Sequence, residues 1–252
     1  SCTILIYLFH MNIANKYSIQ LVNDNCHAIG ASYLKNYQYA IKYADIITQS
    51  FHPVKHFTTG EGGVILTNNK EIDFKVRTLR SHGMKKKSNN IHGPWYYEMH
   101  ETGYNYRITD IQCALGSSQL KRLGSFIARR REIARLYDKH LSEVLGLQIP
   151  YTSDYVEHAY HLYPLQIDFD GFVIKKVDFF KKMNIAGINL QVHYIPIHLQ
   201  PFYKKRFGFS HGDYPISEKF YEREVSLPIY PSLSSEEQDF VLESIIKIIK
   251  DL

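Results

Sequence analysis

Short β-type runs alternate with longer runs of helical period along this chain, and no other feature of the sequence constrains the fold as strongly. Strands are predicted over residues 18–23, 44–51 and 64–68, where apolar and β-branched side chains lie between turn residues. Residues 71–82 instead space their apolar side chains as an amphipathic helix does, and Thr109 precedes another helical run. The alternation predicts an α/β fold.

The second half continues the alternation after a shift in composition near residue 123. Its predicted elements are a helix over 125–145, a strand over 161–168, a helix over 174–184 and a strand over 187–193. We therefore expect two domains, one over residues 1–122 and a small C-terminal α/β domain over residues 123–252.

The last helix is predicted from its own residues. Ser234 and Glu237 have the spacing of a capping box, in which each side chain binds a backbone amide of the other. Phe240, Ile245 and Ile249 follow and are expected to mark the apolar face.

Composition excludes several classes of protein. The 30 Lys and Arg residues against 25 Asp and Glu give a net charge of +5, with 44% hydrophobic and 22% charged residues. These values exclude a disordered tail, a collagen-like repeat and a coiled coil. The densest basic cluster, Lys85 to Lys87, is short and lacks an aromatic platform. We interpret it as a solvated loop and expect no nucleic-acid partner.

No stretch approaches the ~20 apolar residues that a membrane span needs. The opening segment SCTILIYLF is short and has no basic start, so neither a membrane segment nor a signal peptide is expected. Cys2, Cys26 and Cys113 are far apart and predict neither a disulfide framework nor a zinc site. A cytoplasmic location is expected.

Two charged residues near predicted strand ends are the candidates for chemistry. Lys55 follows Pro53 and precedes TTGEGG, a setting that suits a fixed amine forming a Schiff base. A surface lysine in a glycine-rich turn fits the same pattern, and spacing alone favours it. Asp24 lies at the carboxyl end of a strand, where its carboxylate would keep a ring nitrogen protonated. An aspartate that only makes a turn fits the same position, and this residue alone favours that interpretation.

Four blocks taken together make the pattern much more specific. They are LVNDNCHAIGA, ADIITQSFHPVKHFTTGEGGVILTNN, LRSHGM and ETGYNYRITDIQCALGSSQLKRL. In this order, the blocks resemble the DegT/DnrJ/EryC1/StrS family of sugar aminotransferases from about residue 12 to the end. The resemblance implies pyridoxal 5'-phosphate (PLP) as the cofactor and the fold of PLP-dependent transferases of fold type I, which is aspartate aminotransferase-like.

The family's site residues map onto positions of this chain. Lys55 matches the lysine that forms the Schiff base and moves the proton, and Asp24 matches the partner of the pyridine nitrogen. His27 occupies the position beside the cofactor ring, and Ser50 matches a serine on the cofactor phosphate. Asn105 matches an asparagine that reaches the phosphate of the neighbouring subunit's cofactor, which implies a homodimer with shared active sites.

The distal blocks bear on the substrate. HLYPL, QVHYIPIHLQPFY and KFYEREVSLPIYPSLSSEEQ are similar to family members that aminate carbon 4 of a UDP-linked 4-keto-6-deoxy sugar in pseudaminic acid biosynthesis. The resemblance implies this UDP-sugar and L-glutamate as partners, and it places His193 and Tyr194 near the sugar nucleotide. Another nucleotide-linked keto sugar remains an alternative. Pro196 separates His193 from His198 and prevents helical presentation, so no metal is expected.

Two departures from the family are visible. Asn23 stands where the family usually has glutamate before the aspartate. The family also carries a further N-terminal region, on the order of a hundred residues, with a phosphate-binding turn and part of the central sheet. We therefore expect residues 1–122 to be a truncated large PLP-binding domain, and both an active enzyme and an inactive remnant remain open.

Overall fold

A computed structural model describes residues 4–86 and 91–250, so Cys2 and Lys87 lie outside the described residues. By its internal contacts the chain divides into two compact units. The first comprises residues 1–124 and 153–159, and the second comprises residues 125–152 and 160–252. The expected domain boundary at residue 122 stays a prediction.

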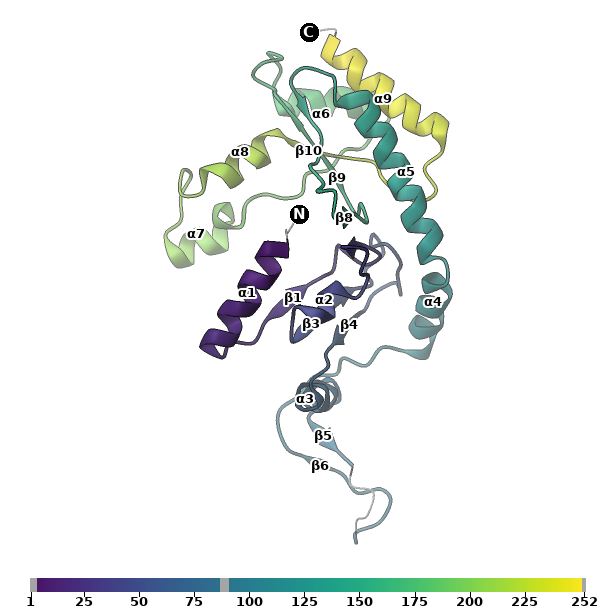
Figure 1. The fold of residues 1–252 in the computed structure, drawn as a ribbon, viewed down its shortest axis with the longest axis vertical. Coiled ribbons are helices and arrows are strands. Elements are labelled where there is room, and N and C mark those ends of the chain that lie inside the picture. Colours follow the sequence, from purple (N-terminus) through teal and green to yellow (C-terminus); the bar gives the residue numbers. More distant parts are fainter. Residues whose placement is uncertain (1–3, 87–90, 251–252) are drawn as a thin grey trace. The chain divides into compact units, whose positions relative to one another are not determined.

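The first unit is built on a three-stranded sheet with the order β1-β3-β4 (Figure 1). Strand β1 (Val22–Asp24) runs parallel to β3 (Ile46–Ser50), and β4 (Gly63–Leu66) pairs with β3 in the antiparallel direction. The predicted strand over 18–23 thus begins four residues late, because the chain first forms helix α1 (Ile4–Tyr17) and a turn.

Helices and two short strand pairs complete this unit. They are β2 (Ser32–Tyr33), α2 (Tyr39–Lys42), α3 (Lys70–Arg80), β5 (Met84–Lys85), β6 (Glu98–Met99), α4 (Asp110–Leu120) and β8 (Val156–Glu157). The predicted helix over 71–82 is confirmed as α3, and Thr109 caps α4 together with Gln112. Strands β5 and β6 pair with each other in the antiparallel direction. Strand β8 pairs with β2 across more than a hundred residues of chain.

The second unit has an antiparallel sheet with the order β10-β9-β7. Its elements are α5 (Leu123–Leu141), β7 (Leu147–Gln148), β9 (Tyr163–Ile167), α6 (Lys176–Ile185), the 3-10 turn η1 (Ile197–Leu199), α7 (Pro201–Phe207), α8 (Pro215–Arg223), β10 (Glu224–Leu227) and α9 (Ser235–Lys250). Strands alternate with helices in both units, so the expected α/β class is confirmed. The strand predicted over 187–193 is wrong, because only Gln191 forms a bridge there, with Ser226.

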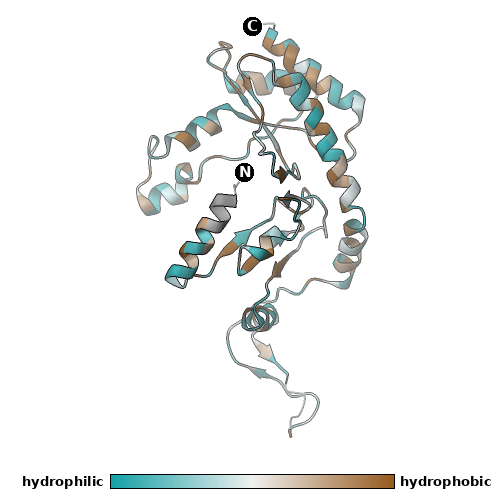
Figure 2. Ribbon diagram, viewed as in Figure 1, coloured by the Kyte–Doolittle hydropathy of each residue, from teal (hydrophilic) through white to brown (hydrophobic). Residues whose placement is uncertain are grey.

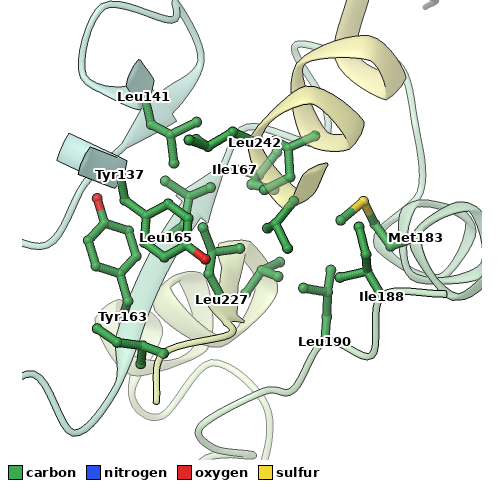
Figure 3. Packing of buried hydrophobic residues seen from close by; sticks show 14 of the residues in the cluster. Tyr137, Leu141, Tyr163, Leu165, Ile167, Met183, Ile188, Leu190, Leu227 and Leu242 are labelled. Carbon is green, nitrogen blue, oxygen red and sulfur yellow. The ribbon is translucent and has the colours of Figure 1, made fainter. Parts of the chain in front are cut away.

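The hydrophobic core of the second unit lies between the sheet and helices α5, α6 and α9 (Figure 3). Figure 2 shows hydrophobic and hydrophilic residues alternating around α5 and α9, as amphipathic helices require. The capping box of Ser234 and Glu237 is confirmed by two hydrogen bonds of 2.8 and 3.1 Å. Ile245 is fully buried, but Phe240 is 50% exposed, so its assignment to the apolar face was wrong.

Several polar side chains inside this core form hydrogen bonds. Tyr137 donates to Pro228 O at 2.8 Å, and Tyr163 donates to Asp138 Oδ1 at 2.7 Å. Arg130 of α5 is 4% exposed, and its Nη1 donates to the carbonyl oxygens of Tyr160, His161 and Ile229 at 3.1, 3.3 and 2.8 Å. Buried polar groups are tolerated because such bonds replace those lost to water.

Candidate functional site

The parallel pair β1 and β3 places two predicted site residues at one edge of the sheet. Asp24 is the last residue of β1 and lies opposite Thr48 of β3. Ser50, the last residue of β3, follows two positions later. The carboxyl ends of parallel strands form the ligand-binding edge of open α/β sheets. Asp24 and Ser50 therefore share the edge at which such folds bind ligands.

Lys55 lies in the loop that leaves this edge. The loop is closed by hydrogen bonds from Phe51 N to Gly62 O at 2.9 Å and from Lys55 N to His52 O at 3.0 Å. A Cβ atom at Gly63 would lie 2.7 Å from Gln49 O, so β4 can approach β3 this closely only with glycine there. These constraints fix the backbone on both sides of Lys55, whose side chain is partly buried.

Asp24 is held as a carboxylate by its neighbours. Its Oδ1 accepts from Cys26 N at 3.1 Å. Hydrogen bonds from the thiol and the backbone of Cys26 lower the pKa of Asp24, and the charges of His27 and Lys55 lower it further, although burial opposes them. A carboxylate that stays ionised is the group required to pair with a protonated ring nitrogen.

The pKa of Lys55 is also lowered, but for a different reason. Burial lowers the pKa of Lys55, while the charges of Cys26 and Asp24 oppose that shift. An amine with a lowered pKa is more readily deprotonated and therefore a better nucleophile. Lys55, Asp24 and His27 interact electrostatically within one unit, so the structure brings these predicted site residues together.

Cys26 is the residue of this site that sequence reasoning missed. Its Sγ lies 3.8 Å from Thr48 O and 4.0 Å from Thr48 Oγ1. Burial is the main cause that raises the pKa of its thiol, and the hydrogen bond to Asp24 raises the pKa further. The sequence did contain a signal for Cys26: it stands two residues after Asp24, and an aspartate commonly accepts a hydrogen bond from the backbone amide at that spacing.

Asn105 lies elsewhere in the first unit. It forms an isolated antiparallel bridge with Ser81, just after α3, and it is exposed. The rings of Tyr104 and Tyr106 on either side of it stack with centroids 4.7 Å apart. Its predicted role requires a second subunit and stays a prediction.

His193 and Tyr194 belong to the second unit. The backbone N of His193 donates to Glu224 Oε2 at 2.9 Å, and its Nδ1 lies 2.7 Å from Ser226 Oγ. Tyr194 is 61% exposed, and its ring meets that of His193 edge-on at 4.6 Å.

Within residues 4–86 and 91–250, no group of three or more His, Cys, Asp or Glu residues is arranged to hold a metal ion.

His198, the other histidine of this segment, takes part in a separate buried contact. Its Nε2 lies 2.6 Å from Glu218 Oε1, and Glu218 also accepts from Gly212 N at 2.9 Å. This contact ties η1 to α8 and to the turn before it.

Among the helices that the structure describes, none has both the length and the apolar character needed to cross a bilayer.

Comparison with known proteins gives consistent matches over almost the whole chain. The model of the DegT/DnrJ/EryC1/StrS aminotransferase family matches residues 10–246. An uncharacterized protein of Methanocaldococcus jannaschii is 40% identical over 96% of this chain and 63% of its own length. The UDP-4-amino-4,6-dideoxy-N-acetyl-beta-L-altrosamine transaminase of Campylobacter jejuni is 38% identical over 95% of this chain and 61% of its own length.

A solved structure agrees with this similarity. A Helicobacter pylori aminotransferase involved in the biosynthesis of pseudoaminic acid superposes with a TM-score of 0.87 and 30% identity, over 98% of this chain and 64% of that one. This chain therefore spans a little over three fifths of the length of the proteins it matches. The fold is that of the PLP-dependent transferases of fold type I, in a shorter chain than its homologues have.

Proposed function

Because the chain belongs to the DegT/DnrJ/EryC1/StrS aminotransferase family, we propose that it is a PLP-dependent aminotransferase of nucleotide-linked keto sugars. One observation supports this most directly: Asp24 and Lys55, with lowered pKa values, interact at the carboxyl edge of β1 and β3. An ionised carboxylate and a readily deprotonated amine are the two groups that this chemistry requires from the protein.

The donor set fits PLP. When bound, PLP withdraws electrons from the carbon that carries the transferred amino group, which makes its proton easier to remove. Asp24 would keep the proton on the ring nitrogen, because its carboxylate is held ionised by Cys26. Lys55 would hold the cofactor and move the proton, because its amine is partly buried and its loop is fixed.

Two further residues have supporting roles in the proposal. Ser50 accepts from His52 N at 3.3 Å, which leaves its hydroxyl proton to donate to a phosphate. His27 lies close enough to Asp24 to lower its pKa by its charge, and we place it beside the cofactor ring.

For the substrate we propose L-glutamate as amino donor and a UDP-linked 4-keto-6-deoxy sugar, aminated at carbon 4, as acceptor. The similarity to the Campylobacter jejuni transaminase supports this choice, and His193 and Tyr194 would contact the sugar nucleotide. Another nucleotide-linked keto sugar is the alternative. We also propose a cytoplasmic homodimer in which Asn105 reaches the neighbouring site, an assembly that cross-linking and light scattering would test.

Borohydride reduction tests the cofactor assignment without relying on turnover. The 252-residue chain would be incubated with PLP, reduced, digested and analysed by mass spectrometry. We expect the phosphopyridoxyl label on Lys55, its loss in Lys55→Ala, and its retention in Lys70→Ala as a control at an exposed lysine. A label on another lysine, or no specific label, would contradict the proposal.

A further inference from the structure

Asn25 is a buried polar residue at the start of the turn that follows β1. It is 7% exposed, and its carbonyl oxygen accepts from Ala28 N at 3.0 Å, which closes a β-turn, the Asn25 turn. Cys26 and His27 are the two central residues of the Asn25 turn, and Asp24 immediately precedes it. The turn therefore carries or adjoins the residues that the proposed function places at the cofactor ring.

Two further hydrogen bonds anchor the Asn25 turn to the rest of the first unit. Asn25 N donates to Thr48 O of β3 at 3.0 Å, and Asn25 Oδ1 accepts from the hydroxyl of Tyr39, in α2, at 3.0 Å. An amide oxygen can only accept, so Tyr39 supplies the proton. Tyr39 is 6% exposed, so both groups of this bond are shielded from bulk water, and breaking it leaves a buried polar group unsatisfied.

The turn reaches the carboxylate of Asp24 through Cys26. Cys26 N donates to Asp24 Oδ1 at 3.1 Å, and the direction of this N–H is set by the turn in which Cys26 lies. Hydrogen bonds from Cys26 are the largest causes that lower the pKa of Asp24. A displacement of the turn would lengthen these bonds, so the carboxylate would be less well stabilised.

The ring and the hydroxyl of Tyr39 have separate roles. The ring lies against that of Tyr33, with centroids 6.3 Å apart, and this contact needs no hydroxyl. Tyr39→Phe thus keeps the packing and removes the donor of Asn25 Oδ1. A tyrosine that only fills space in α2 is the alternative, and it predicts no effect of this substitution on Asp24.

We propose that Tyr39 and Asn25 are positioning residues that hold the Asn25 turn, so that Asp24 and His27 keep the places from which they meet the cofactor ring. The hydrogen bonds that hold the turn lie within the first unit, whereas the cofactor as their target rests on the function proposed above. Residues that orient reacting groups matter because a small displacement of those groups weakens their interactions.

Carbon NMR tests the role of the turn without the cofactor. In the 252-residue chain labelled with 13C-aspartate, the carboxyl signals are followed against pH, and Asp24→Asn identifies the signal of Asp24. We expect Tyr39→Phe to raise the pKa of Asp24 towards its ordinary value, because the bonds from Cys26 loosen. The charges of His27 and Lys55 act on Asp24 in both chains, so the change reports the turn. If Asp24 keeps its pKa in a folded Tyr39→Phe chain, Tyr39 does not position it.

Asn25→Ala tests the same bond from its other partner, because it removes the side chain and keeps the backbone bonds. It should raise the pKa of Asp24 as Tyr39→Phe does, and the double variant should raise it no further, since both changes remove one shared bond. Tyr37→Phe is the matched control, because the Tyr37 hydroxyl donates to Glu157 Oε2 at 2.9 Å instead. An equal shift in Tyr37→Phe, or additive shifts in the double variant, would overturn the pairing.

Titration with PLP, followed by its visible absorbance, tests the link to the cofactor. Loss of one neutral hydrogen bond should raise Kd by about tenfold in Tyr39→Phe, and Tyr37→Phe should leave Kd unchanged. An equal Kd in Tyr39→Phe and the unsubstituted chain would overturn the positioning role. If the unsubstituted chain binds no PLP while Asp24 responds as expected, the proposed function fails and the role of the turn stands.

Discussion

Arg130 offers the most quantitative test of how the second unit is held together. Its guanidinium donates to three carbonyl oxygens, and burial lowers its pKa from 12.5 to about 10. At ~1.4 kcal/mol per pKa unit, that shift corresponds to about 3 kcal/mol of unfavourable desolvation. Hydrogen bonds to a charged group contribute about 1.5–3 kcal/mol each. All three contacts share Nη1, which has two hydrogens, so two full hydrogen bonds are counted; near the upper end of that range they exceed the desolvation cost.

Arg130→Met removes the buried charge and its hydrogen bonds while keeping a long side chain. We expect the free energy of unfolding to fall by about 3 kcal/mol, because the carbonyl oxygens lose a donor inside the core. For a unit of this size the melting temperature should fall by roughly 10 °C. Urea unfolding followed by circular dichroism and scanning calorimetry would measure both quantities.

Arg135→Met is the matched control, because Arg135 is exposed on the same helix. It should change the free energy of unfolding by less than about 0.5 kcal/mol. If Arg130→Met were as stable as this control, the desolvation of the cation would cancel its hydrogen bonds, and the reasoning would be wrong.

Three further predictions concern the site and the two units. Asp24→Asn should slow the half-reaction with glutamate about a hundredfold or more, since the ring-nitrogen partner is lost; an undiminished single-turnover rate would contradict this. Gly103→Ala should destabilise the first unit by about 2 kcal/mol in urea unfolding, because its Cβ would overlap the backbone of Gly83 and lie 2.8 Å from Leu79 O. Burial raises the pKa of Asp138 and the bond from Tyr163 lowers it, so Tyr163→Phe should raise it further. A raised carboxyl pKa stabilises below the unfolded value and loses that contribution as pH rises through the folded value, so the loss in Tyr163→Phe should be larger at pH 7.5 than at pH 4.5.

Local patterns predicted the parts of the fold that depend on neighbouring residues. The capping box of Ser234 was visible because it depends on a partner three residues away, and Thr109 was visible as the residue before a helical run. Phe240 was misplaced because helical spacing alone does not say which of two adjoining stripes meets the core. The predicted strand over 187–193 failed because the one β-bridge formed by these residues joins Gln191 to Ser226, far along the chain.

The candidate site likewise contains residues that local sequence patterns mark and contacts that such patterns do not show. Asp24 and Lys55 became candidates because a strand end and a glycine-rich loop mark them in the sequence, and the resemblance of four blocks to one family then selected them. The contact of His193 with Ser226 joins residues 33 apart, and that of Ser32 with Glu157 joins residues 125 apart. No periodicity reports such pairs, because they exist only once the sheets have formed.

Strand β8 gives the chain an order of events during synthesis. Residues 153–159 belong to the first unit, where Ser32 donates to Glu157 Oε2 at 2.8 Å and the His56 ring contacts Ala159 O at 3.2 Å. Those partners leave the ribosome only after helix α5 and β7 have been made. The first unit therefore needs a segment that is translated between two parts of the second unit. Residues 1–124 cannot complete their native contacts until that segment, residues 153–159, has been synthesised. A release of the nascent chain before residue 159 would leave β2 with an unpaired edge, which is the kind of surface that chaperones recognise.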